Sequence, residues 1–135
     1  MKICIWLGTI SDIGGVQRLC TLLANELAKE NEVTIASFDT PEKLANAVYK
    51  LDKRVKFVEF PKNKVSSNIF YRIMRRILFK LIRNDKYLER IDFPKFMRKR
   101  LVTFFNQGEY DVVIGVAWLH SLWLAMVAPE IKART

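Results

Sequence analysis

Two adjacent glycines, Gly14 and Gly15, stand between an apolar run at residues 3–7 and an amphipathic pattern that continues to about residue 29. A short apolar run predicts a buried strand, and apolar residues spaced three and four apart predict a helix. Glycines at such a junction allow a sharp turn and a close approach of a ligand to the backbone, while the N-terminus of the helix favours an anion. This order of strand, glycine turn and helix is typical of nucleotide-binding α/β domains.

The alternation of strand and helix patterns continues along the chain. Further strands are predicted at residues 32–38, 55–60 and 110–116, and further helices at residues 40–51 and from residue 122. The residues expected to face the sheet are Val16, Leu19, Cys20, Leu23 and Leu27 on the first helix and Leu44, Val48 and Leu51 on the second. Strands separated by helices imply a parallel sheet with right-handed crossovers. We expect one α/β domain over residues 1–135, with a Rossmann-like parallel sheet in the order 3-2-1-4 and flanking helices.

In this strand order the first and fourth strands flank the point where the winding direction reverses. Ligands of open α/β sheets bind there, at the carboxyl ends of the strands. The glycine turn should therefore face the loop after the fourth strand, which contains Trp118, His120 and Ser121. Two interpretations of His120 remain open, a site residue or a structural residue beside Trp118 and Trp123. Ser121 is a candidate cap for the following helix.

Basic charge is concentrated in the middle of the chain. Residues 50–100 hold 17 Lys and Arg against five Asp and Glu, whereas the segments on either side are slightly acidic. Apolar residues at helical spacing predict a basic helical insertion at about residues 66–106, between the third and fourth strands. Its candidate membrane-surface residues are Arg72, Arg75, Arg76, Lys80 and Arg83, and a second basic cluster follows at Lys95, Arg98, Lys99 and Arg100.

Three interpretations of this basic segment compete. A packed helix with a solvated charged face is the common case. A helix in an anionic membrane interface would gain about 1 kcal/mol from each Lys or Arg near the surface. Nucleic acid is disfavoured, because the aromatic residues follow the apolar stripe and form no stacking platform.

Composition and motif spacing exclude several other classes of protein. Half of the residues are hydrophobic, which disordered chains do not show. One histidine and two scattered cysteines supply no recognisable metal site, so we expect no metal and no cofactor. Cys4 and Cys20 are expected to be buried thiols of a reduced, cytoplasmic protein, and no apolar run is long enough to span a membrane. The spacing of Gly8, Gly14 and Gly15 does not fit the dinucleotide fingerprint, which disfavours an oxidoreductase.

Several segments resemble the N-terminal half of group-1 (family 4) retaining glycosyltransferases. They are residues 2–6, the run Gly14-Gly15-Val16-Gln17-Arg18, the helix as far as residue 28, and residues 32–34. Residues 111–115 are similar to that family's fourth strand. The resemblance implies the GT-B arrangement, in which two Rossmann-like domains face each other across a cleft. The N-terminal domain takes the acceptor, and the C-terminal domain holds most of the nucleotide-sugar donor.

The resemblance also implies roles for particular residues. Gly14 and Gly15 would let backbone N–H groups approach the donor diphosphate, with Arg18 near the same charge; a solvated first turn is the alternative for Arg18. Many members of the family place a histidine at the carboxyl end of the fourth strand, where this chain has Val116, and His120 lies four residues further on. Members with lipid-linked acceptors often carry a basic, apolar helical region in this domain, which favours a location at the inner face of the cytoplasmic membrane.

The chain ends at residue 135, where the next strand of the family pattern would begin. From the sequence we therefore expect a C-terminally truncated domain without the donor domain, inactive alone. The expected function is hexose transfer from a nucleotide sugar to a lipid-linked or other acceptor in polysaccharide or glycolipid synthesis. The alternative is a non-catalytic module that binds a membrane surface or a partner.

Overall fold

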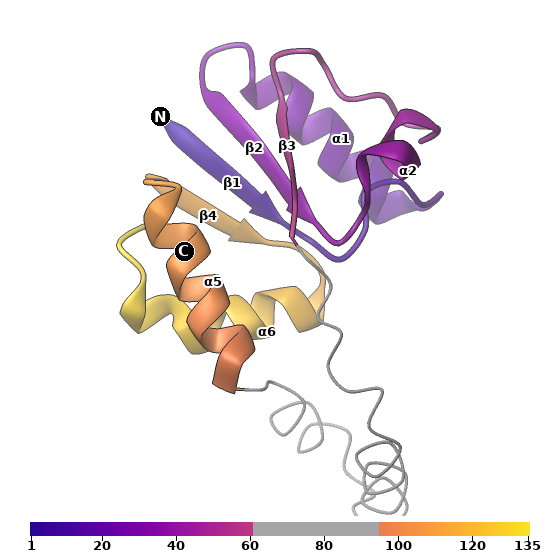
Figure 1. The fold of residues 1–135 in the computed structure, drawn as a ribbon. Coiled ribbons are helices and arrows are strands. Elements are labelled where there is room, and N and C mark those ends of the chain that lie inside the picture. The colour runs from indigo at the N-terminus through magenta and orange to yellow at the C-terminus, as the bar shows by residue number, and fades with distance from the viewer. Residues whose placement is uncertain (61–94) are drawn as a thin grey trace, which may run out of the picture.

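The computed structural model describes residues 1–60 and 95–135, and these form a parallel sheet with helices on both faces (Figure 1). The elements are β1 (Lys2–Trp6), α1 (Gly15–Leu27), β2 (Glu32–Ser37), α2 (Pro41–Ala45), β3 (Lys56–Glu59), α5 (Lys95–Gln107), β4 (Val112–Gly115) and α6 (Trp118–Val127), followed by a 3₁₀ turn at Ala128–Glu130. All strand pairs are parallel, and the order is β3-β2-β1-β4. The α/β fold class and the strand order predicted from the sequence are therefore confirmed.

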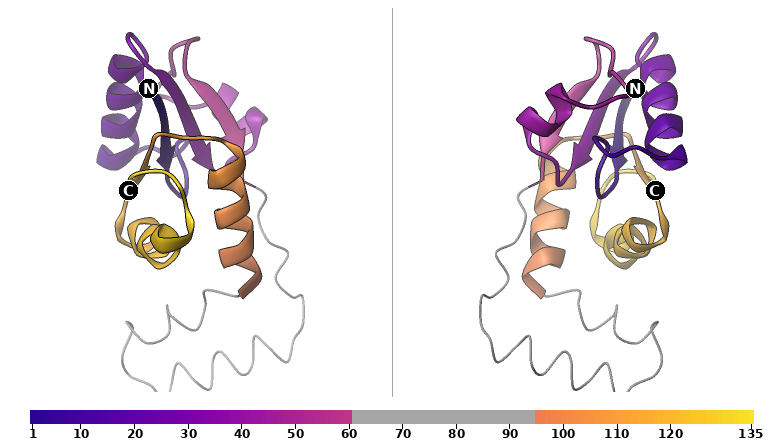
Figure 2. Two further views of the ribbon diagram at one scale, coloured as in Figure 1. Left: turned by 90° about the vertical axis from the view of Figure 1, so that its left-hand side faces the viewer. Right: turned by 90° about the vertical axis from the view of Figure 1, so that its right-hand side faces the viewer.

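Alternate side chains of β1 enter two separate apolar cores. Ile3 and Ile5 pack with α1 and β2, whereas Cys4 and Trp6 pack with α5 and α6. Alternation of this kind follows from the two-residue period of a strand, and here both faces of the strand are covered. Figure 2 shows α1 and α5 on opposite sides of the sheet.

The face of α1 that contacts the sheet differs from the one expected. Cys20, Thr21 and Ala24 are buried, while Leu19 and Leu22 are 66% and 57% exposed. Val16 and Leu23 of the predicted inward row are exposed as well. Of the predicted inward row, Cys20 is buried and Leu27 is partly buried against the core. The helix therefore contacts the sheet mainly through small residues, while Leu19, Leu22 and Leu23 are exposed.

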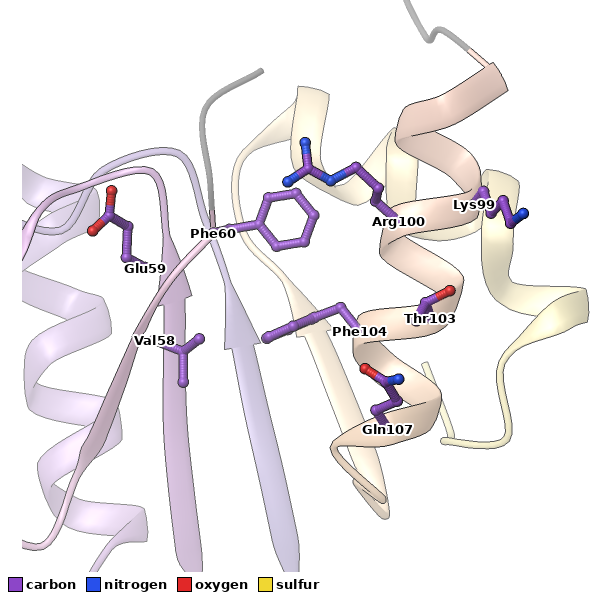
Figure 3. Close-up of a pocket in the computed structure, with 8 residues that line it drawn as sticks. All are labelled: Val58, Glu59, Phe60, Lys99, Arg100, Thr103, Phe104 and Gln107. Carbon is purple, nitrogen blue, oxygen red and sulfur yellow. The ribbon is translucent and has the colours of Figure 1, made fainter. Parts of the chain in front are cut away.

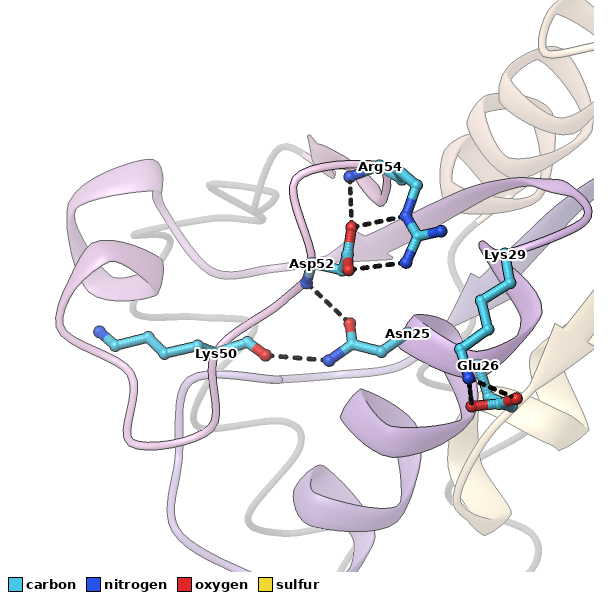
Figure 4. A network of polar contacts seen from close by, with 6 residues as sticks. All are labelled: Asn25, Glu26, Lys29, Lys50, Asp52 and Arg54. Atoms are coloured by element: carbon cyan, nitrogen blue, oxygen red, sulfur yellow. Dashed lines mark hydrogen bonds and ion pairs between the residues drawn. The ribbon is translucent and has the colours of Figure 1, made fainter.

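The second helix is also shorter than predicted. Thr40 caps α2 by accepting a hydrogen bond from the Lys43 N–H, and the helix ends at Ala45. Val48, expected to face inward, is 60% exposed. Asn25 of α1 holds the segment between α2 and β3 in place through two hydrogen bonds (Figure 4). Its side-chain amide donates to the Lys50 carbonyl at 3.1 Å, and its side-chain oxygen accepts from the Asp52 N–H at 2.8 Å.

Residues 131–135 return to the free edge of β4. The Val113 N–H donates to the Arg134 carbonyl at 2.7 Å, and the Arg134 N–H donates to the Asp111 carbonyl at 2.9 Å. These two bonds form a single parallel bridge between Val112 and Arg134. Among the described residues, β3 is thus the outer strand on one side of the sheet and the bridged β4 is the outer strand on the other.

Candidate functional site at the carboxyl edge of the sheet

The glycine turn and the start of α6 emerge from neighbouring strands. Trp6 at the end of β1 pairs in register with Gly115 at the end of β4, and the Val116 N–H donates to the Trp6 carbonyl at 2.9 Å. The loop after β1 and the residues after β4 therefore leave the sheet at the same edge. This is the edge where open α/β sheets bind ligands.

A buried carboxylate, Asp39, organises the loop between β1 and α1. Asp39 lies two residues after the end of β2 and is 3% exposed. One carboxylate oxygen accepts hydrogen bonds from the hydroxyls of Thr9 and Ser11, both at 2.9 Å. The other accepts from the N–H groups of Ile10 and Ser11 at 2.6 and 3.1 Å, and from the Ser37 hydroxyl at 3.1 Å.

This arrangement keeps Asp39 ionised. Burial alone would raise the pKa of the Asp39 carboxyl, but the hydrogen bonds from Ile10, Ser11 and Thr9 outweigh burial and lower the pKa below its usual value. The loop that precedes the glycine turn is therefore held by a buried negative charge just beyond the end of the neighbouring strand β2. Sequence reasoning missed this residue, although an acid placed directly after a strand, opposite Thr9 and Ser11, was the available clue.

The glycine turn itself leaves open space at the start of α1. Gly14 is the N-cap with an extended backbone, and no side chain caps the helix. A side-chain carbon added at Gly15 would meet no atom within 4 Å, and one at Gly14 would meet only the flexible end of Gln17. Internal packing therefore requires neither glycine. Arg18 is exposed and forms no ion pair with any residue in the described ranges.

The three residues predicted after β4 lie in the first turn of α6 and not in a loop. Trp118 is 64% exposed, whereas His120 is buried. Ser121 does not cap the helix, since its hydroxyl donates to the Gly115 carbonyl at 2.9 Å. The N-cap is Ala117, with a positive φ of 64°. The helix begins earlier than predicted because this one residue makes the turn out of β4.

His120 is packed into an aromatic cluster directly below the loop after β1. Its ring centroid lies 5.3 Å from that of Trp6 and 5.7 Å from that of Trp123. A side-chain carbon at Gly8 would lie 2.7 Å from its Cε1 atom. The close approach of the Gly8 backbone to this ring therefore requires glycine, and it brings the loop after β1 into direct contact with the first turn of α6.

Burial keeps the imidazole neutral. It lowers the pKa of His120 to about 4. Neither ring nitrogen has a hydrogen-bond partner within residues 1–60 and 95–135. In this arrangement His120 supports the loop by packing, and of the three residues predicted at this position only Trp118 presents a large exposed surface.

Other expected features fall outside the described ranges or have no counterpart in them. Arg72, Arg75, Arg76, Lys80 and Arg83, the predicted membrane-surface residues, lie in the part of the chain that is not described. Residues 1–60 and 95–135 contain no group of three side chains suited to a metal ion. The same residues contain no helix with the length and apolar character needed to cross a membrane.

The fold and the carboxyl-edge site define a class, the small α/β domain with a Rossmann-like, four-stranded parallel sheet. No protein-family model matches the chain, and no curated protein sequence matches it.

Proposed function

We propose that this chain is the acceptor-side domain of a retaining glycosyltransferase of the GT-B arrangement. It would take part in the transfer of a hexose from a nucleotide sugar to a lipid-linked or other acceptor, in polysaccharide or glycolipid synthesis. The observation that carries the proposal is the uncapped start of α1 at Gly14 and Gly15, with open space around Gly15. This turn lies at the edge shared by β1 and β4.

The proposed chemistry is electrostatic. Backbone N–H groups at the start of a helix are fixed dipoles, and they stabilise negative charge that develops on a departing nucleotide diphosphate. Asp39 fixes the preceding loop through four hydrogen bonds, so the N–H groups at the start of α1 need not be ordered when the ligand arrives. In the proposal a second domain holds the rest of the donor, and this domain alone transfers no sugar.

Titration with UDP, GDP and inorganic diphosphate, followed by amide NMR shifts, tests the assignment. We expect weak binding, with Kd on the order of 1 mM, and shifts concentrated at Gly14, Gly15 and the first turn of α1. The variant Gly15→Asp should abolish these shifts without loss of fold, because an acid in the first turn suits the helix but repels the anion. Gln107→Glu adds the same charge at the far end of α5 and is the matched control. Shifts elsewhere, or sugar transfer by this chain alone, would contradict the proposal.

A second candidate function is a non-catalytic module that binds an anionic membrane surface. One observation favours this function: Lys99 and Arg100 on α5 form no ion pair with any described residue, so both cations are available to an anionic surface. It predicts salt-sensitive binding to vesicles that contain phosphatidylserine, lost when Arg72, Arg75, Arg76 and Lys80 are changed to Gln. Absence of vesicle binding at low salt would remove this candidate.

A further inference from the structure

A cavity lies between the carboxyl end of β3 and α5, on the face of the sheet opposite to α1. It has a volume of about 360 Å³, within the range of small-molecule sites. One wall consists of Val58, Glu59 and Phe60, and the other of Lys99, Arg100, Thr103, Phe104 and Gln107 (Figure 3). Neither the nucleotide proposal nor the sequence patterns assign a ligand to this space.

The floor of the cavity is apolar and held in place by ring packing. The Phe60 and Phe104 ring centroids are 5.4 Å apart in an edge-to-face arrangement. Phe60 also packs edge-to-face on Trp6 at 5.0 Å, which ties the floor to the core. Such an arrangement does not collapse readily to fill an empty space, so the cavity offers preformed apolar surface.

The guanidinium group of Arg100 lies over this apolar floor. The Arg100 guanidinium carbon lies 5.8 Å from the centroid of the Phe60 ring. Arg98, two residues earlier on α5, is paired with Glu130, whereas Arg100 has no carboxylate partner among the described residues. Figure 3 shows Lys99 pointing outward from α5 and Glu59 pointing away from Phe60. Arg100 is therefore the charge that a ligand in the cavity would meet.

We propose that this cavity binds an alkyl chain with an anionic headgroup. The chain lies against Phe60 and Phe104, and the phosphate or carboxylate head accepts hydrogen bonds from Arg100, with Thr103 and Gln107 as polar groups along the α5 wall. Apolar burial and a charge-assisted hydrogen bond then contribute at opposite ends of one molecule. This site lies on the face of the sheet that α5 covers, whereas the glycine turn leads into α1 on the other face, so the inference goes beyond the proposed nucleotide site and does not depend on it.

Chain length provides the first test. Calorimetric titration with alkyl phosphates and alkyl carboxylates of about eight to about fourteen carbons, below their micelle concentrations, should show affinity rising about fourfold per methylene until the cavity is full. Inorganic phosphate alone and dodecyltrimethylammonium should not bind. Comparison of the phosphate and carboxylate series identifies the preferred headgroup. Equal affinity for the cationic amphiphile, or no dependence on chain length, would overturn the proposal.

Two cations, one that lines the cavity and one outside it, provide a matched pair of variants. Arg100→Gln should weaken binding of dodecyl phosphate by about tenfold or more, as for loss of a hydrogen bond to a charged group. Lys132→Gln removes the same charge from an exposed side chain that does not line the cavity, so its effect should stay within about twofold. Should Arg100→Gln fail to fold, Thr103→Trp fills the cavity from an exposed position and should abolish binding. Unchanged affinity in the cavity-filling variant would refute the assignment, whatever the outcome of the nucleotide titration.

Discussion

Replacement of Asp39 should loosen the loop that carries the glycine turn, and the size of the effect follows from its five donors. In Asp39→Asn the amide oxygen can still accept hydrogen bonds from the N–H groups of Ile10 and Ser11. The amide NH₂ group then faces the hydroxyls of Thr9 and Ser11, which can rotate to accept. Hydrogen bonds to a charged acceptor are worth about 1 kcal/mol more than neutral ones, so two weakened backbone bonds predict a loss of about 2 kcal/mol. Asp39→Ala leaves the buried Ile10 N–H without an acceptor and should cost about 4 kcal/mol.

Urea denaturation followed by tryptophan fluorescence measures these losses, since Trp6 is fully buried. Asp12→Asn is the matched control, because Asp12 is exposed in the same loop, and its free energy of unfolding should change by less than about 0.5 kcal/mol.

The pH dependence supplies a second, independent readout. The folded pKa of Asp39 lies below its unfolded value of about 3.9, so its stabilising effect is complete above that pH and is lost as the pH falls through the folded pKa. The difference in unfolding free energy between the wild type and Asp39→Asn should therefore shrink between about pH 5 and about pH 2. A difference that stays constant over this range, or one no larger than that of Asp12→Asn, would refute the reasoning.

Three further predictions concern the glycines after β1, the buried His120 and the buried Cys4. Gly8→Ala should destabilise the fold by about 1–3 kcal/mol, since its new carbon would overlap the His120 ring, whereas Gly15→Ala should be neutral or stabilising in the same unfolding assay. The NMR shift of the His120 Cε1 proton should stay constant from about pH 8 to about pH 5.5, because burial lowers the pKa to about 4; a midpoint near the ordinary value would exclude this environment. Cys4, whose pKa burial raises to about 12, should react with a thiol reagent only after unfolding, and rapid labelling of native protein would contradict its placement.

The strand order could be predicted from the sequence because it rests on strong local patterns. Four apolar runs separated by helical patterns leave few topologies once crossovers must be right-handed. The face of α1 could not be predicted in the same way. Leu19 and Leu23 follow the helical period, but that period does not distinguish a helix that buries its leucines from one that packs through Cys20, Thr21 and Ala24.

The candidate site also has features that could be predicted from the sequence and features that could not. The neighbourhood of the glycine turn and the residues after β4 followed from topology alone. The buried state of His120 and the role of Asp39 depend on contacts between residues about 30 and more than 100 positions apart, such as Thr9 with Asp39 and Gly8 with His120. No local pattern encodes such contacts.

The bridge between Val112 and Arg134 bears on how copies of this chain behave in concentrated solution. Unpaired N–H and C=O groups along an outer strand are templates for cross-strand association between molecules. At β4 the Val113 N–H and the Asp111 carbonyl are already bonded to Arg134. At the opposite margin, β3 is only four residues long and carries Lys56 and Glu59 at its ends, which are the charged, short features that oppose sheet-to-sheet aggregation. Variants that remove the charges of β3 should therefore reduce solubility more than variants that alter residue 134.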